Sequence, residues 1–310
     1  MELGEMNQAE NVDHSEASDS SLDNDKSKTK AKLSDIYHAV KTVILSRQHP
    51  VTGLFPASTD VNTHGDYTDA WVRDNVYTIM APWALSKAFK KSGDKLKCDE
   101  LEQATVKLMR GLLQCMMRQA NKVESFKYSL AAHDSLHAKY NTATGLEVVA
   151  DHAWGHLQID ATSIYLLLLA QVTAGGQRII VTQAEVDFVQ NLIYYISRAY
   201  RIRDFGIWER GNKINNGKTE VNASSVGMAK AALTALDGLN LFGCDGPASA
   251  VVHTIADAIA RAEATLQTLL PRESRSKECD SALLSVIGFP AFAVDDKQVI
   301  QRTRDEIRSK

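Results

Sequence analysis

The chain has 310 residues, of which 44% are hydrophobic and 24% charged, and its formal net charge is -3. This composition is typical of a soluble globular protein of one or two domains, and the near-neutral charge argues against nucleic acid or anionic membrane as a partner. The four cysteines form no CxxC pair, so we expect reduced, cytosolic thiols and no metal, and no apolar run approaches the roughly 18 residues of a membrane span. Gly175-Gly176 and Gly211-Asn212-Lys213 lack the spacing of a nucleotide-binding motif, so we expect no cofactor.

The first 32 residues differ from the rest of the chain. They are rich first in Glu, Asp, Ser and Asn and then in Lys. Such a segment cannot bury enough apolar surface to offset its ordering entropy, so residues 1–32 are predicted to be a disordered tail. From Leu33 the apolar residues recur at helical spacing, and the pattern predicts a helix that ends at His49-Pro50. Residues 33–310 are expected to form the N-terminal portion of a helical domain.

The middle of the chain predicts helices and few strands. A helix begins near Val76, contains Pro82 and ends at Ser92-Gly93. A second runs from Leu101 to Met117, and residues 122–154 are predicted to be a long irregular connection.

A nearly all-apolar helix is then predicted to begin at Asp160 and to stop at Gly175-Gly176. Thr182 and Glu185 form a capping box, which predicts a helix from Gln183 to about Tyr200. Asn222 is predicted to cap a helix that runs through Leu239, and further helices are expected at about 248–270, 280–288 and 295–309. The alternation of buried and amphipathic helices predicts an all-α toroid of inner and outer helices.

Three stretches combine a tryptophan with a carboxylate close to a helix start: residues 66–77, 154–160 and 205–211. A sugar presents flat apolar faces and many hydroxyls, so its pocket needs aromatic platforms beside charged hydrogen-bonding groups. If the stretches meet at one end of a barrel, they would form a carbohydrate cleft. A structural ion pair at Arg73 and Asp74, which pins a loop to a helix start, is the alternative.

Glu209 is the candidate general acid of such a cleft. Trp208 beside it would lower the local polarity, and a desolvated carboxylic acid keeps its proton to higher pH. An ion pair with Arg210 or Lys213 is the alternative role of Glu209, and a helix N-cap is the alternative role of Asp160.

The spacing of His152 and His156 would suit a metal only on a regular helix. Trp154-Gly155 between them argues against such a helix, so we expect no metal site.

The same stretches carry a family resemblance. WVRD (Trp71 to Asp74), WGHLQID (Trp154 to Asp160) and GIWE (Gly206 to Glu209) resemble motifs of the family 15 glycoside hydrolases, the glucoamylases. The longer runs HPVTGLFPAS, NTHGDYTDAWVRDNVY, WGHLQIDATS, DFGIWERG and NASSVGMAKAAL resemble the regulatory subunits of phosphorylase kinase over about residues 33–296. The intact Arg-Asp pair is similar to the α branch of that family rather than to the β branch.

This resemblance implies an (α/α)6 toroid, a six-hairpin glycosidase-like barrel, in a non-kinase regulatory subunit that controls phosphorylation of glycogen phosphorylase in glycogen breakdown. The implied partners are the kinase catalytic subunit, the other regulatory subunit and calmodulin, with glucose or an α-glucan as a ligand. The resemblance further implies a general-acid position at Glu209. It also implies a glucose subsite that is formed by Trp71, Arg73, Asp74, Trp154, Asp160 and Trp208.

The chain departs from the family at its C-terminal end. It predicts fewer helices than the twelve of an (α/α)6 toroid, so the barrel is expected to be incomplete, and the second catalytic carboxylate of a glucoamylase is expected beyond Lys310. We therefore expect a relic site without hydrolysis. An active α-glucan hydrolase and a sensor of glucose or glycogen ends are the alternatives. The expected location is the cytoplasm, or the cytoplasmic face of the cell membrane if a longer form carries a prenyl anchor beyond Lys310.

Overall fold

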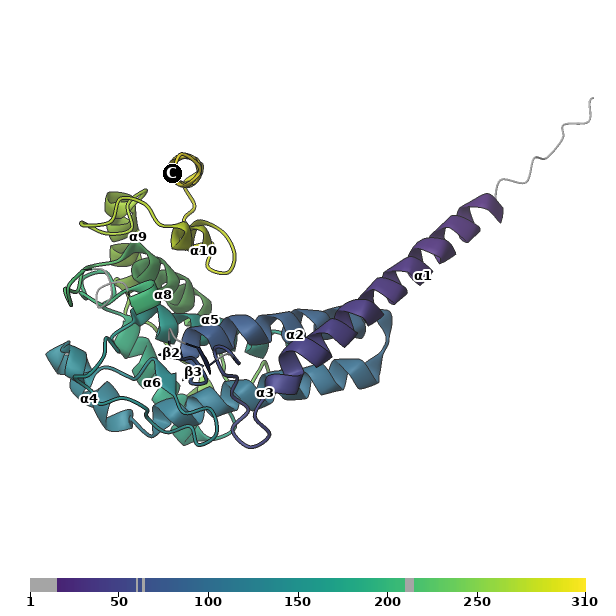
Figure 1. Cartoon of the computed structure of the whole chain (residues 1–310), viewed down its shortest axis with the longest axis horizontal. Helices are drawn as coiled ribbons and strands as arrows, with labels where there is room; N and C mark the ends of the chain where they lie inside the picture. Colours follow the sequence, from purple (N-terminus) through teal and green to yellow (C-terminus); the bar gives the residue numbers. More distant parts are fainter. Residues whose placement is uncertain (1–15, 60, 63–64, 210–214) are drawn as a thin grey trace, which may run out of the picture.

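Three buried helices form the centre of the molecule. The computed structural model describes residues 16–59, 61–62, 65–209 and 215–310. The central helices are α2 (Val72–Ser92), α5 (Ile159–Ala174) and α8 (Ala223–Leu236), and α5 packs against both of the others (Figure 1). Nearly every residue of α5 is buried, because a helix that is apolar on all sides must be covered on all sides.

Amphipathic helices cover this centre from outside. Helix α3 (Lys95–Met117) packs on α2, α6 (Gln183–Ile196) packs on α5, and α9 (Ala258–Leu269) packs on α8. Each of these outer helices buries one face and exposes the other. The alternation of inner and outer helices is therefore present, as predicted.

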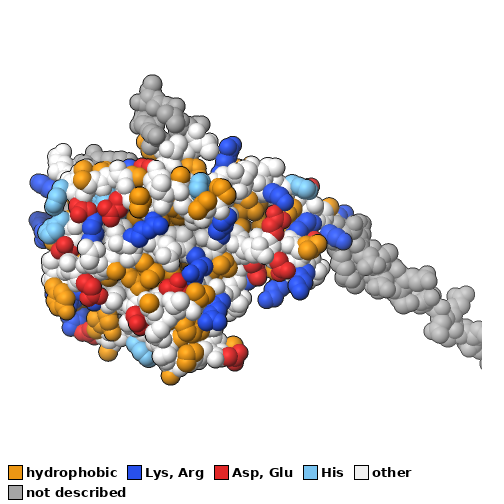
Figure 2. Space-filling model, turned by 90° about the horizontal axis from the view of Figure 1, so that it is seen from below, with side chains coloured by type: hydrophobic (Ala, Val, Ile, Leu, Met, Phe, Trp, Pro, Cys, Tyr) orange, Lys and Arg blue, Asp and Glu red, His pale blue; other side chains and the backbone are white. Residues whose placement is uncertain are grey.

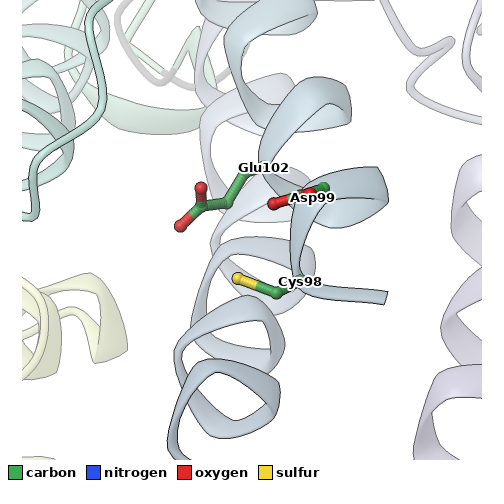
Figure 3. Close-up of side chains that lie close together, drawn as sticks. All are labelled: Cys98, Asp99 and Glu102. Atoms are coloured by element: carbon green, nitrogen blue, oxygen red, sulfur yellow. The ribbon is translucent and has the colours of Figure 1, made fainter. Parts of the chain in front are cut away.

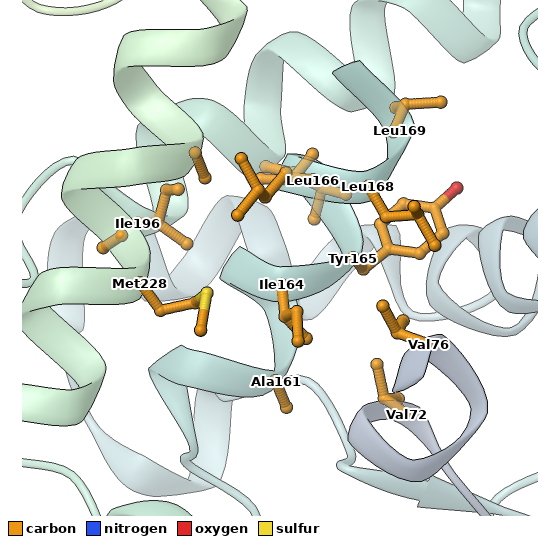
Figure 4. Close-up of a cluster of buried hydrophobic side chains, with 14 of the residues drawn as sticks. Val72, Val76, Ala161, Ile164, Tyr165, Leu166, Leu168, Leu169, Ile196 and Met228 are labelled. Carbon is orange, nitrogen blue, oxygen red and sulfur yellow. The ribbon is translucent and has the colours of Figure 1, made fainter. Parts of the chain in front are cut away.

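The core between the inner helices is made of side chains from several elements. Figure 4 shows them meeting: Val72 and Val76 from α2, Ala161, Ile164, Tyr165, Leu166, Leu168 and Leu169 from α5, Ile196 from α6 and Met228 from α8. Burial of one aliphatic side chain of this size contributes about 1.5–3 kcal/mol to stability. The centre of α5 is therefore the main hydrophobic anchor of the fold.

Several helix ends lie where local signals predict them. The Thr182 side chain accepts a hydrogen bond from the Glu185 amide at 3.2 Å, and the Glu185 carboxylate accepts one from the Thr182 amide. This reciprocal capping box begins α6. Helix α2 ends at Gly93, which has a φ of 78°, a conformation that glycine adopts without steric cost.

The connection between α3 and α5 is more ordered than predicted. It contains α4 (Ala120–Ser129), whose buried Val123 and Phe126 pack the helix towards α6. Two apolar positions are too few for the hydrophobic periodicity to predict a helix. The connection also contains β4 (Lys139–Tyr140), which pairs antiparallel with β3 (Ala70–Trp71) and so ties the connection to the start of α2. A second short pair consists of β1 (Val61–Asn62) and β2 (Gly65–Asp66).

The last predicted helices are shorter than expected. The segment 248–257 contains a 3-10 turn, Ala248–Ala250, before α9 begins. The helix expected at 280–288 consists of a 3-10 turn, Ser281–Leu283, followed by the single turn α10 (Leu284–Ile287). The final helix, α11 (Lys297–Arg308), lies close to its predicted range.

Helix α1 (Glu16–Ala39) extends away from the body of the molecule (Figure 1). It begins inside the segment that was predicted to be disordered, whose residues 1–15 lie outside the described part. Packing against the body starts at Leu33, where the apolar periodicity starts in the sequence. Tyr37 and Val40 then form a small cluster with side chains of α2 and α3: Leu85, Phe89, Cys98 and Leu101.

The surface carries mixed charges. In the face shown in Figure 2, acidic and basic side chains are interspersed with small apolar areas. Among the helices in the described part of the chain, none combines the length and the apolar character needed to cross a membrane.

Candidate functional site

The N-terminal ends of the three inner helices meet in one region. Arg73 is the second residue of α2 and Asp160 the second residue of α5. Asp204, in the loop before α8, accepts hydrogen bonds from the Ile159 amide of α5 at 3.0 Å and from the Ser225 hydroxyl of α8 at 2.6 Å. The first residues of these three inner helices are therefore held close together.

Arg73 and Asp160 form a buried ion pair. The Nε atom of Arg73 donates to Asp160 Oδ2 at 2.6 Å, and its Nη2 donates to Asp160 Oδ1 at 3.1 Å and to Gln158 Oε1 at 2.7 Å. The two residues are only 2% and 3% exposed. Such burial is tolerated because both charges are paired in a bidentate geometry.

The alternative role of Asp160 as the N-cap of its helix is wrong. The N-cap of α5 is Gln158, and the Asp160 carboxylate instead holds Arg73. Its position in the first turn adds a favourable interaction with the helix dipole. This ion pair fixes α2 to α5, and it joins Arg73 to Asp160 rather than to the neighbouring Asp74.

Asp74 is half-buried next to this pair. Burial raises the pKa of its carboxyl above the ordinary value, and the positive charge of Arg73 partly opposes that shift. Within the described residues, Asp74 forms no ion pair with another side chain. Its carboxylate can therefore accept hydrogen bonds from a ligand.

Two tryptophan rings pack against each other next to the start of α2. Trp71 and Trp154 pack edge to face with their ring centroids 5.1 Å apart. The Lys139 ammonium lies 5.4 Å from the Trp71 ring and 5.3 Å from the Trp154 ring, and it pairs with Asp69 at 3.2 Å. Sequence reasoning missed Lys139, because only the β3–β4 register places it opposite Trp71.

A third tryptophan, Trp208, lies over the guanidinium of Arg73. Its ring centroid lies 5.4 Å from the Arg73 guanidinium carbon, and the residue is 54% exposed. It adopts a left-handed conformation with a φ of 60° in the 3-10 turn Ile207–Glu209. A non-glycine residue in that conformation costs about 1–2 kcal/mol, so the surrounding structure holds this ring in place.

Glu209 follows Trp208 in the same turn, but its side chain lies outside the described part of the structure. Arg210 and Lys213, its alternative ion-pair partners, lie outside it as well. The general-acid role and the ion pair thus stay predictions.

Asp204 is a second residue that sequence reasoning missed. It is 1% exposed and also accepts a hydrogen bond from the Asn222 amide group at 2.7 Å. Burial raises the pKa of Asp204 to about 6, against the effect of these donors. Asn222 is the predicted N-cap of α8, yet its side chain donates a hydrogen bond to Asp204 and makes no capping hydrogen bond to the helix. The sequence did contain a signal for Asp204, because this residue begins the run DFGIWERG that carries the family resemblance.

The loops that carry the tryptophans are in direct contact. The Phe205 amide donates to the Leu157 carbonyl at 2.9 Å. A Cβ atom at Gly155 would lie 2.7 Å from the Phe205 ring, so only glycine permits this approach.

A pair of stacked histidines lies next to Trp154. His137 and His156 stack with centroids 3.7 Å apart, and His137 Nε2 lies 2.7 Å from Asp151 Oδ1. Burial, followed by the charge of His137, lowers the pKa of His156 to about 4, so its ring is neutral at physiological pH. His152 and His156 do not share a helix, as predicted.

Among the described residues, two groups of side chains come close enough to hold a cation, and a lysine pairs with a carboxylate of each group. His137, Glu147 and Asp151 form the first, where the Lys122 ammonium bonds Asp151. Cys98, Asp99 and Glu102 of α3 form the second (Figure 3), where Lys87 pairs with Glu102 at 3.0 Å. Burial raises the pKa of the Cys98 thiol, which keeps it protonated. Neither arrangement favours a metal.

The fold is therefore a set of helical hairpins with tryptophan, arginine and carboxylate side chains at one end. The chain belongs to the Glycosyl hydrolases family 15, whose sequence pattern matches residues 30–310. Family membership confirms the prediction of a mostly helical, glucoamylase-like (α/α)6 fold, of which the described residues contain three inner and outer helix pairs.

Within this family the chain is homologous to the α regulatory subunits of phosphorylase b kinase. It is 56% identical over 92% of its length to the probable α regulatory subunit of Drosophila melanogaster and to the skeletal muscle isoform of Oryctolagus cuniculus. The chain spans 23% of the length of these curated relatives. A solved glucoamylase from Saccharomycopsis fibuligera matches 68% of this chain and 44% of its own at 13% identity, with a TM-score of 0.45.

Proposed function

We propose that the chain functions as an α-type regulatory subunit of phosphorylase kinase, without kinase activity of its own. It would control phosphorylation of glycogen phosphorylase, and hence glycogen breakdown. The observation that supports this role is the 56% identity to α regulatory subunits over 92% of the chain.

The proposed partners are the kinase catalytic subunit, the other regulatory subunit and calmodulin, and the proposed location is the cytoplasm. The small net charge of -3 is compatible with such protein partners. Calmodulin binding, and a prenyl anchor that would hold the protein at the membrane, belong to the same proposal.

Assembly tests this proposal. A tagged chain is expressed together with the three partners and purified through the tag. The retained complex is expected to transfer phosphate to phosphorylase b, whereas a tagged glucoamylase used as a control should retain no kinase. Failure of the folded chain to retain any of the partners would overturn the proposal.

We further propose that the cluster around Arg73 binds a terminal glucose of an α-glucan. Arg73 is held rigidly by Asp160 and Gln158, the exposed ring of Trp208 covers it, and Asp74 offers acceptor oxygens beside it. This combination of aromatic platform and fixed polar groups is what a sugar site needs.

Calorimetric titration of the chain with maltotriose tests this second proposal. Asp74→Asn is expected to weaken binding about tenfold, since a hydrogen bond to a charged group contributes about 1.5–3 kcal/mol. Asp187→Asn, on the exposed face of α6, is the matched control and should bind as the unaltered chain does. A folded chain that gives no heat would exclude a sugar ligand.

A further inference from the structure

A cavity of about 640 Å³ lies away from the sugar cluster, beside the loop that leads into α8. Its walls come from three segments: Arg203, residues 215–221 and residues 269–276. It shares no lining residue with the group around Arg73. Small-molecule pockets have volumes of about 300–1,000 Å³, so this cavity has room for a compact metabolite.

The walls carry an excess of positive charge. Arg203, Lys218 and Arg275 line the cavity and are exposed. Within the part of the chain that the structure describes, none of these three side chains forms an ion pair. Glu220 is the one carboxylate among the described lining residues, which therefore have a net charge of +2.

Glu220 holds the walls together. Its Oε1 atom accepts a hydrogen bond from the Ser276 amide at 3.0 Å. Its Oε2 atom accepts hydrogen bonds from the Ser274 hydroxyl at 3.0 Å and from the Asn215 side chain at 3.1 Å. Because these oxygens bind the neighbouring loops, Glu220 fixes Arg275 and Lys218 on the same cavity without forming an ion pair with either.

We propose that this cavity binds a small molecule carrying a phosphate group, with Arg203, Lys218 and Arg275 around the phosphate. A phosphate monoester has a charge of about -1.5 to -2 near neutral pH, which matches the net charge of the walls. Arginine forks suit its oxygens in a bidentate geometry, and lysine adds a compact charge. Val221 and Leu269 provide an apolar surface for the rest of the molecule.

The site is connected to the ends of the inner helices. Asp204 and Glu220 exchange two backbone hydrogen bonds, at 2.9 and 3.1 Å. The Asp204 side chain in turn holds the first residues of α5 and α8. A ligand in the cavity would therefore stabilise the same loop that positions these helices.

Calorimetric titration of the full chain with glycerol 3-phosphate tests the proposal. Glycerol is the phosphate-free control, and inorganic phosphate shows whether the ester part contributes. Glycerol 3-phosphate is not a sugar, so the result does not depend on sugar binding at the Arg73 cluster. Binding of glycerol 3-phosphate but not of glycerol is expected, and it should weaken with added salt. Binding of inorganic phosphate with equal affinity would locate recognition in the phosphate group itself.

Variants complete the test. The double variant Arg203→Gln, Arg275→Gln is expected to lose at least about tenfold in affinity, since charge-assisted hydrogen bonds contribute about 1.5–3 kcal/mol each. Arg304→Gln, an exposed arginine of α11 outside the cavity, is the matched control and should bind normally. Equal affinity in the double variant, or no heat with either phosphate probe on folded protein, would overturn the proposal.

Discussion

Arg73 shows how a single residue joins the sequence motif to the fold. Its guanidinium is bound by two side chains from the start of α5, and the ring of Trp208 covers it from the loop before α8. One buried cation therefore connects all three stretches that the sequence marked as unusual. Removal of either partner of a buried ion pair leaves an uncompensated charge, and this is costly in a low-dielectric interior.

Arg73→Ala is expected to lower the free energy of unfolding by about 3–5 kcal/mol, because it leaves the Asp160 carboxylate buried without its partner. Urea denaturation measures this loss. The matched control is Arg261→Ala, which removes an exposed arginine paired with Asp257 in the same helical segment and should cost much less. Equal losses in the two variants would contradict the assigned role of the buried pair.

Glu273 predicts a pH dependence of stability. It is 1% exposed, its carboxyl contacts Ser224 at the start of α8, and burial raises its pKa from 4.5 to about 8. Between these two values the folded chain binds a proton that the unfolded chain has released. Stability should therefore fall as the pH rises from 4.5 to 8, by at most about 1.4 kcal/mol per pH unit from this group.

Glu273→Gln should flatten this part of the stability profile, because an amide does not titrate. Denaturant unfolding at intervals between pH 5 and pH 8 measures the two slopes. A variant that keeps the slope of the unaltered chain would show that Glu273 does not cause this pH dependence.

At the scale of elements, the close approach of α10 to α8 depends on a glycine. A Cβ atom at Gly227, in the middle of α8, would overlap the Val286 side chain of α10. Glycine inside a helix normally weakens it, so its presence here reflects packing rather than local preference.

Gly227→Ala is expected to destabilise the chain by about 1–3 kcal/mol through overpacking. In a Val286→Ala background the space is larger, and the same substitution should cost less. A double-mutant cycle of unfolding free energies gives the coupling between the two positions. Purely additive effects would show that the contact with Val286 does not cause the destabilisation by a side chain at position 227.

Sequence signals at this scale differ in strength. The apolar character of α5 and the capping box of α6 are encoded in neighbouring residues, and both helices lie where the sequence predicts them. Helix α4 has only a narrow apolar face, and its packing towards α6 stabilises it, so sequence periodicity could not reveal it. The role of Lys139 depends on strand register, which is set by tertiary packing and not by its neighbours in the chain.

At the scale of the whole molecule, the resemblance of the motifs to family 15 glycoside hydrolases predicted the fold, and the family match over residues 30–310 confirms it. The arrangement of the candidate site was predictable in part. Tryptophans and charged residues near helix starts predicted that residues 66–77, 154–160 and 205–211 would lie close together, and inner helices with their N-termini at one end explain why Arg73 lies beside Asp160 and Trp208. The pairing of Arg73 with Asp160 and the role of Asp204 could not be predicted from local sequence, because they join residues that are 87 and 45 positions apart.

We propose that this family 15 domain works in regulation rather than in hydrolysis. A glycosidase needs two carboxyl groups, a general acid and a base or nucleophile. Glu209 is the predicted general acid. We propose that the sugar cluster binds a glucan end and leaves it intact.

Release of glucose from maltooligosaccharides by the purified chain tests this claim most directly, with Glu209→Gln as the matched control. We expect the unaltered chain to release no more glucose than the variant does. Glucose release that disappears in Glu209→Gln would contradict the claim and identify the chain as an active α-glucan hydrolase.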